Sequence, residues 1–122
     1  MLKYLMVGVG GFLGSILRFW LGSYIGNKMG SRFPYGTFVI NITGSFLVGL
    51  VFALLTVKTQ WSPNWRYLIP IGFIGGYTTF STFEWEVFAL GRSAPPMAVV
   101  YGLSSVAVGL LACWAGASLA RR

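Results

Sequence analysis

The residues best suited to chemistry in this sequence are neutral hydrogen-bond donors gathered around the run GGYTTFSTF at residues 75–83. Phe80 and Phe83 are three residues apart and share one face of a helix, while Ser81 and Thr82 add hydroxyls between them. The edge of an aromatic ring is the positive part of its quadrupole, so these rings could face an anion edge-on. Conduction requires binding strong enough to replace hydration and weak enough to release the ion. Several neutral donors in series suit a small, strongly hydrated anion.

Further polar residues recur four positions apart on other segments, so each set falls on one stripe of a helix. In a membrane protein such a stripe is either glue between helices or the wall of a wet pathway, and the residues alone leave both interpretations open. Phe80 and Phe83 have core packing as their alternative role. Glu86 is a proton site, a partner for an arginine, or simply an exposed residue. The stripes are Thr37, Asn41 and Ser45; Thr82 and Glu86; and Tyr101, Ser105 and Gly109.

The same residues argue against catalysis, metal clusters and nucleic-acid binding. The sequence has no His, one Cys and only two acids, and it offers no credible nucleophile–base pair, metal cluster or internal disulfide. Cys113 lies in apolar sequence and is expected to be an inert packing residue. The nine basic residues are scattered over loops and ends rather than gathered in a patch that would follow phosphates. We therefore expect neither an enzyme nor a nucleic-acid-binding protein.

The elements that carry these residues are apolar segments long enough to cross a bilayer. Of the 122 residues, 56% are hydrophobic and 9% are charged, whereas a typical soluble domain has about 25% charged residues. About 20 apolar residues suffice to span a membrane. Four segments qualify, at about residues 5–25, 37–57, 68–90 and 98–119. The sequence thus predicts an all-α membrane protein with a single four-span domain over residues 1–122.

The third of these segments is predicted to be a broken helix. A short apolar helix over residues 68–74 is followed by two glycines and two threonines, which interrupt it, and a helical pattern resumes at Phe80. At membrane depth, non-helical backbone is tolerated only inside protein or against a water-filled cavity. Broken helices in membranes often turn carbonyl groups and half-helix ends toward ions. The break is therefore the expected centre of function.

The first segment carries Gly10 and Gly14 four residues apart and, one turn later, Arg18. Small residues at this spacing let helices approach closely in lipid, which explains the glycines at least as well as a pore role. An arginine so deep in a span is costly unless it finds a partner or water. Arg18 is accordingly an anion-attracting vestibule residue or a structural anchor, with snorkelling to headgroups as the alternative.

The distribution of positive charge bears on orientation in the membrane. Four spans place both termini on one side, and orientation follows the excess of Lys and Arg. The side with the termini has five such residues, and the other side has three, or four if Arg18 is included. This near-balance predicts insertion in both orientations and assembly of an antiparallel pair. The residues are Lys3, Lys58, Arg66, Arg121 and Arg122 on one side and Lys28, Arg32 and Arg92 on the other.

The run GGYTTFSTF, together with Asn41 in GTFVINITGS, resembles the small fluoride channels of the Fluc/CrcB family. The resemblance extends from Gly10 to about Gly109. It implies an antiparallel, dual-topology homodimer in the bacterial inner membrane, with two pores through which cytoplasmic fluoride leaves passively. The implied function is fluoride resistance. The implied partners are a second copy of the chain, fluoride and membrane lipid, with no nucleic acid.

The resemblance also implies roles for individual residues in the fluoride path. Asn41 matches the pore asparagine, Phe80 and Phe83 match the phenylalanines that line the path, and Arg18 matches the arginine of the first span. Where some members carry a second serine one turn after Ser105, this sequence has Gly109, which puts the length of its polar track in doubt. The residues that match the polar track are Ser81, Thr82, Glu86, Tyr101 and Ser105.

A structural sodium ion is the one cofactor that the resemblance implies. It would lie at the centre of the dimer, held by the backbone carbonyls of Gly75 and Thr78, two from each subunit. This agrees with the physical expectation that a break at the dimer axis leaves carbonyl groups unpaired. Oxygen ligands of this kind suit a hard cation.

Two other functions are compatible with a small four-span protein. A small multidrug exporter also has four spans and dual topology, but it depends on a membrane-embedded glutamate in the first span, and here that span has no acid. A non-transporting assembly subunit would use the polar stripes as glue. Mutation of Asn41 or Phe80 separates the two interpretations, because glue predicts loss of assembly and a pore predicts intact dimers with altered flux.

Overall fold

The computed structural model describes residues 1–58 and 60–122, and every regular element within them is helical. Three helices are long, and the third apolar segment of the sequence is divided among three shorter pieces. The elements are α1 (Leu2–Met29), α2 (Tyr35–Val57), the π-helical turn η1 (Tyr67–Ile74), α3 (Gly75–Tyr77), α4 (Ser81–Ser93) and α5 (Pro95–Ala120).

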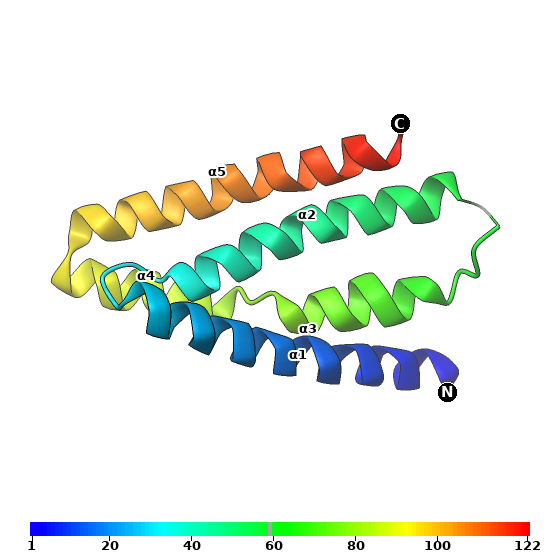
Figure 1. Ribbon diagram of the computed structural model, residues 1–122, viewed down its shortest axis with the longest axis horizontal. Helices are drawn as coiled ribbons and strands as arrows, with labels where there is room; N and C mark the ends of the chain where they lie inside the picture. The colour runs from blue at the N-terminus through cyan, green and yellow to red at the C-terminus, as the bar shows by residue number, and fades with distance from the viewer. Residues whose placement is uncertain (59) are drawn as a thin grey trace.

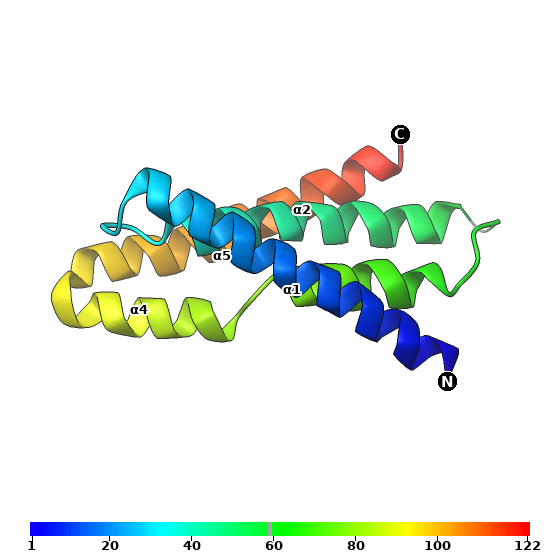
Figure 2. The ribbon, with the colours of Figure 1, turned by 60° about the horizontal axis from the view of Figure 1, so that its bottom comes forward.

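The helices run back and forth along one long axis (Figure 1). Both termini, the end of α2 and the start of η1 lie at one end of the molecule, and the turns from α1 to α2 and from α4 to α5 lie at the other. α5 packs along α2, while α1 packs on η1 and α3. Figure 2 shows α1 crossing in front of the other helices at the level of the gap between α3 and α4.

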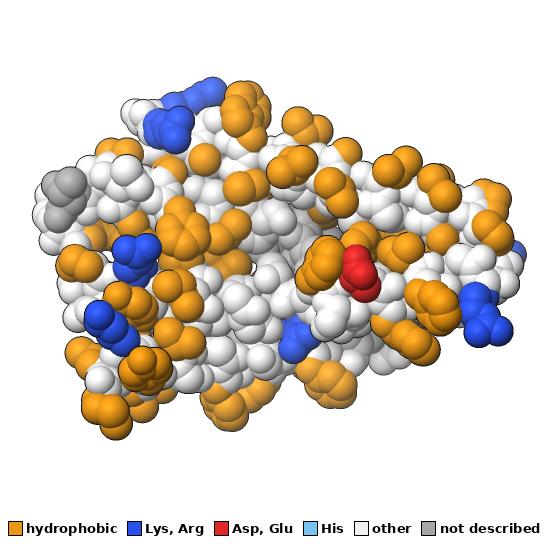
Figure 3. Space-filling view, turned by 180° about the vertical axis from the view of Figure 1, so that it is seen from behind, with side chains coloured by type: hydrophobic (Ala, Val, Ile, Leu, Met, Phe, Trp, Pro, Cys, Tyr) orange, Lys and Arg blue, Asp and Glu red, His pale blue; other side chains and the backbone are white. Residues whose placement is uncertain are grey.

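The outer surface of this bundle is apolar. α1, α2 and α5 are each long and hydrophobic enough to cross a membrane. Large apolar side chains such as Phe19, Leu110 and Trp114 are exposed, and Figure 3 shows apolar side chains over much of one face, with basic side chains mainly toward its ends. Such a surface suits contacts with lipid or with another protein. The chain is a multi-pass membrane protein.

Prolines and one glycine set the helix ends. Pro34 precedes α2 and Pro95 begins α5, positions where the missing N–H costs nothing because the first turn has no partner for it. Gly30 ends α1 with φ of 81°, a conformation that favours glycine. Pro70 lies within η1, and the wide π-type turn accommodates its lack of an N–H.

Glycines let α1 lie directly against η1 and α3. A Cβ added to Gly10 would overlap the carbonyl oxygen of Leu68, and one added to Gly14 would overlap that of Phe73. The packing interpretation of these two glycines is therefore confirmed, as expected where small residues line helix contacts in membranes.

The two glycines of the GGYTTFSTF run do not form the interruption, which is a correction to the sequence interpretation. Gly75 and Gly76 are helical, and the non-helical residues are Thr78 to Phe80. Gly76 instead allows α3 to pack closely against α1, since a Cβ there would come within 2.6 Å of the Gly11 carbonyl oxygen. The interruption itself is held by side chains from other positions.

Candidate functional site

The interruption at Thr78 to Phe80 is held by the amide of Asn41 from α2. Thr78 has an extended backbone with φ of −81° and ψ of 159°. The Asn41 Nδ2 donates to the Thr79 carbonyl oxygen at 2.9 Å, and the Thr79 N–H donates to Asn41 Oδ1 at 2.9 Å. Asn41 thus supplies the hydrogen bonds that the backbone loses on leaving the helix.

The hydroxyl of Thr79 caps the start of the next helix, α4. It accepts a hydrogen bond from the Thr82 N–H at 3.3 Å, which caps one of the unpaired donors at the start of α4. The sequence interpretation assigned no role to Thr79. The signal was present in the pattern Thr79-Phe80-Ser81-Thr82, because threonine is a favoured residue just before a helix.

The hydrogen bonds of Asn41 and of the Thr79 hydroxyl leave the carbonyls of Gly75 and Thr78 without their usual helical donors. In an unbroken helix, the Gly75 carbonyl would accept from the Thr79 N–H and the Thr78 carbonyl from the Thr82 N–H. Those donors bind Asn41 Oδ1 and Thr79 Oγ1 instead. Both carbonyl oxygens therefore lack their helical partner, and both residues line the same cavity.

That cavity, which we call the inner cavity, has a volume of about 330 Å³ and lies beside the interruption between α2 and α5. It brings together six of the residues that the resemblance to the fluoride channels assigned to the ion path or the sodium site, from three different segments of the chain. They are Asn41, Gly75, Thr78, Phe80, Phe83 and Ser105.

The two phenylalanines of this cavity have different surroundings. Their ring centroids lie 5.9 Å apart, with 42° between the ring planes. Phe83 is 9% exposed and meets Tyr101 edge-on at 5.2 Å, so core packing is part of its role. Phe80 is 72% exposed. A phenylalanine next to a polar interruption and uncovered in this way is available to a second molecule.

A polar cluster lies just under one turn along α4 from Phe83, at Glu86. The Thr37 hydroxyl donates to Glu86 Oε1 at 2.7 Å and the Tyr101 hydroxyl donates to Oε2 at 2.7 Å. Tyr101 is completely buried and meets Phe33 edge-on at 5.1 Å. Of the three alternatives for Glu86, simple exposure is therefore wrong. Thr37 belongs to the stripe seen in the sequence but was not assigned to the site.

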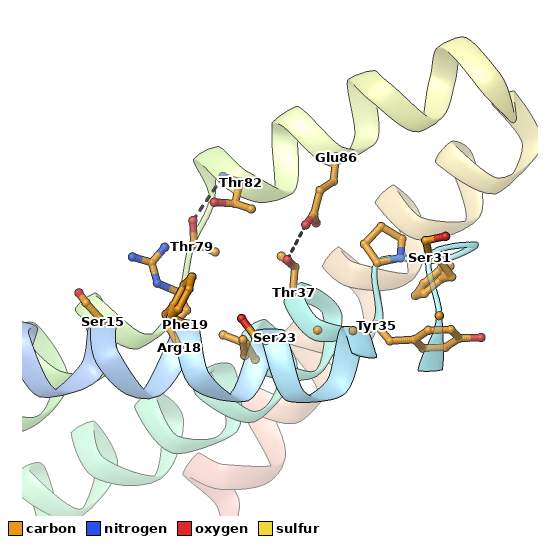
Figure 4. A pocket seen from close by; sticks show the side chains of 17 residues that line it. Ser15, Arg18, Phe19, Ser23, Ser31, Tyr35, Thr37, Thr79, Thr82 and Glu86 are labelled. Atoms are coloured by element: carbon orange, nitrogen blue, oxygen red, sulfur yellow. Dashed lines mark hydrogen bonds between the residues drawn. The ribbon is translucent and has the colours of Figure 1, made fainter. Parts of the chain in front are cut away.

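Glu86 faces a larger cavity of about 750 Å³, the outer cavity, at the end of the molecule where α1 meets α2. Arg18 and Thr82 line the same cavity, and in Figure 4 the Arg18 side chain points from α1 toward the segment that carries Thr79. Arg18 forms no ion pair within residues 1–58 and 60–122. The cavity thus has a guanidinium at one side and a hydrogen-bonded carboxylate at the other.

The three predicted serine and threonine residues have different surroundings. Thr82 is exposed on the outer cavity. Ser105 lines the inner cavity, and its buried hydroxyl has no hydrogen-bond partner in the described part of the chain. Ser81 is exposed and lines neither cavity. The fold thus brings Ser105 and Thr82 to cavities, but leaves Ser81 facing outward.

Comparison with known proteins assigns the family. Residues 5–117 match the model of the family described as "CrcB-like protein, Camphor Resistance (CrcB)". The chain belongs to the CrcB family. Its relatives include the Fluoride-specific ion channel FluC of Acidobacterium capsulatum, which is 49% identical over 99% of this chain and 98% of its own length. The Fluoride-specific ion channel FluC of Solibacter usitatus is 47% identical over 99% of this chain and its whole length.

A less similar relative also matches nearly the whole chain. The Fluoride-specific ion channel FluC 2 of Clostridium acetobutylicum is 40% identical over 94% of this chain and 95% of its own length. Matches of this extent leave no large part of the chain outside the CrcB family.

Proposed function

We propose that this CrcB protein is a passive, fluoride-selective channel that lets cytoplasmic fluoride leave across the bacterial inner membrane. The observation that carries the proposal is the name of its relatives, fluoride-specific ion channels, matched over nearly the whole chain. The chemistry of the inner cavity supports it, because that cavity presents amide, hydroxyl and aromatic donors rather than a strong cationic trap.

The fluoride path would run from the outer cavity to the inner one. Arg18 would raise the local concentration of anions at the entrance. Both oxygens of Glu86 accept hydrogen bonds there, from the hydroxyls of Thr37 and Tyr101. Beyond it, the ring edges of Phe80 and Phe83 and the Ser105 hydroxyl would replace water around the ion. Ser81, which faces outward, would join the path only at a subunit interface.

The channel would be an antiparallel homodimer with two pores. Two observations support this arrangement. Phe80 is exposed beside the interruption, so a second subunit would have to cover it and complete the path. The positive residues at the two ends of the molecule number five and three, which gives only a weak preference for one orientation in the membrane.

A structural sodium ion would lie where two interruptions meet. The carbonyls of Gly75 and Thr78 fit this role, because side chains have taken the N–H groups that would otherwise pair with them. Two carbonyls from each subunit would provide four oxygen ligands for a hard cation. Sodium bound there would supply positive charge between the two pores without forming part of either path.

The experiment that tests the proposed function is fluoride efflux from proteoliposomes that contain the purified protein, followed with a fluoride electrode. Valinomycin and potassium balance the charge, and chloride-loaded vesicles and protein-free vesicles serve as controls. Fast fluoride release with little chloride release supports the channel. A well-folded dimer that releases no fluoride contradicts it, and the polar stripes would then be packing glue in an assembly subunit.

The same vesicles distinguish the multidrug-exporter alternative. An exporter couples substrate to protons and would respond to an imposed proton gradient, whereas a passive channel follows the fluoride gradient alone. α1 holds no acid that could carry such a proton.

A further inference from the structure

The inner cavity contains a hydroxyl that nothing in the described protomer satisfies. Ser105 Oγ is inaccessible from outside and has no hydrogen-bond partner among the described residues. A polar group buried without a partner is costly, and such groups in native proteins call for an explanation such as an unseen water or ion. Ser105 therefore marks a place where a small polar ligand would be held.

One turn further along α5 the chain has Gly109, so α5 itself offers no second hydroxyl there. Close packing does not require this glycine. A Cβ on Gly49 or on Gly116 would overlap backbone of the facing helix, at Cys113 and Phe46 respectively. A Cβ on Gly109 would instead meet its nearest neighbour at 3.5 Å, an ordinary van der Waals distance.

That nearest neighbour is the hydroxyl oxygen of Ser45, on α2. Ser45 lines the inner cavity together with Asn41 and Ser105. The hydroxyls of Thr43 and Thr56 on the same helix donate to carbonyls of their own helix, whereas the Ser45 hydroxyl takes part in none of the hydrogen bonds of the described residues. It is free to donate to a ligand in the cavity.

We propose that Ser45 is a fluoride-coordinating residue that supplies, from α2, the hydroxyl that α5 lacks at position 109. Ser45 and Ser105 would then form a pair of donors from two helices, facing one ion beyond the phenylalanine rings. The polar path would keep its length although it changes helix. This inference rests on the proposed fluoride function and extends it to a residue of α2.

The test compares fluoride efflux of S45A with that of the unchanged protein. Loss of one hydrogen-bond donor is expected to slow efflux about threefold to tenfold, with the dimer fraction and the unfolding temperature unchanged. The matched control is S104A, which removes a hydroxyl from α5 that is already bonded to the Tyr101 carbonyl at 3.3 Å. S104A is expected to conduct like the unchanged protein.

A relocation experiment separates ion coordination from packing. S45A/G109S moves the hydroxyl from α2 to α5, and the space around Gly109 admits it once Ser45 is shortened. We expect the double variant to recover most of the lost efflux. If S45A/G109S is as slow as S45A, a hydroxyl at position 109 of α5 does not replace the one of Ser45, and the proposal that the two positions are equivalent is wrong. S45A with unchanged efflux would overturn the role of Ser45, and so would S45A that loses its dimer.

These outcomes are distinct from failure of the proposed function. If the unchanged protein releases no fluoride, the channel proposal fails before any variant is compared. If it releases fluoride rapidly and S45A does the same, the channel stands and the Ser45 assignment falls.

Discussion

At the scale of single residues, Asn41 combines a structural task with its place on the inner cavity. Its amide forms two hydrogen bonds to the backbone of Thr79, so one of its Nδ2 hydrogens is committed and the other is left for a ligand. We expect N41A to leave the Thr79 N–H and carbonyl unsatisfied, at a cost of about 1–3 kcal/mol for each group. Both the unfolding temperature in detergent and fluoride efflux should fall.

The matched control for this prediction is N64A, which removes an amide from the connection between α2 and η1 rather than from the interruption. It is expected to match the unchanged protein in stability and efflux. If N41A alters efflux while its unfolding temperature stays that of the unchanged protein, Asn41 acts on the ion directly and does not hold the backbone.

The cluster at Glu86 makes a second prediction at this scale. Tyr101 is locked between Phe33 and Phe83, so Y101F keeps the ring in place and removes only the hydroxyl that donates to Glu86. A hydrogen bond to a charged group is worth about 1.5–3 kcal/mol. We expect efflux to fall by about tenfold or more with the dimer intact.

E86Q and the double variant Y101F/E86Q complete a cycle that measures the coupling of the two side chains. Residues in direct contact usually show coupling of about 0.5–3 kcal/mol. We expect the double variant to conduct no worse than the poorer single variant. Effects that simply add would mean that Tyr101 and Glu86 act independently of each other.

At the scale of elements, glycine positions on α1 predict which contacts hold the broken helix. G14A would place a methyl group against the Phe73 carbonyl, whereas a methyl group on Gly8 meets nothing within 4 Å. Overpacking of this kind costs about 1–3 kcal/mol. We expect G14A to lower the unfolding temperature and G8A to leave it unchanged. Equal stability of the two variants would contradict close packing of α1 on η1.

Hydrophobicity alone predicted the long helices, because each of α1, α2 and α5 is a continuous apolar run of sufficient length. Hydrophobicity did not predict where the third apolar segment is interrupted. Two glycines and two threonines were expected to form the break, and only the threonines lie in it, because Gly76 instead allows the close approach of α1. The interruption lies later, at Thr78 to Phe80, since Asn41 from α2 stabilises it there.

The pairings within the site were beyond sequence reasoning for a similar reason. Asn41 and Thr79 are 38 residues apart, and Thr37 and Glu86 are 49 apart. Helical spacing indicates which residues share a stripe on one helix, but not which stripes face each other. The stripe of Thr37, Asn41 and Ser45 was visible in the sequence, and the structure divides it between the outer and the inner cavity.

At the scale of the whole molecule, a sodium ion between two interruptions would tie assembly to ion composition. A ligand bound only to the folded dimer stabilises it by about 2.7 kcal/mol at 100 times its dissociation constant. We expect replacement of sodium by N-methylglucamine to lower the unfolding temperature of the dimer, and restored sodium to recover it. An unfolding temperature that does not respond to sodium would contradict a sodium ion held by Gly75 and Thr78.

The orientation of the chain in the membrane depends on the basic residues of its loops and ends. Replacing Lys28, Arg32 and Arg92 by neutral residues leaves all loop charge at the end that holds the termini, so nearly all molecules should insert with that end in the cytoplasm. Replacing the five basic residues of the terminal end should reverse the orientation. A reporter at the C-terminus, active on one side of the membrane only, measures both shifts.

If the channel is an antiparallel dimer, these two variants are complementary. Each variant alone has no partner of opposite orientation, so neither is expected to release fluoride from cells, while co-expression of the two should restore efflux. The unchanged chain, with the reporter active on both sides, is the control. Efflux from either variant alone would mean that parallel subunits suffice. The exposed ring of Phe80 would then be covered by a partner of the same orientation, and the near-balance of charge would have no role in assembly.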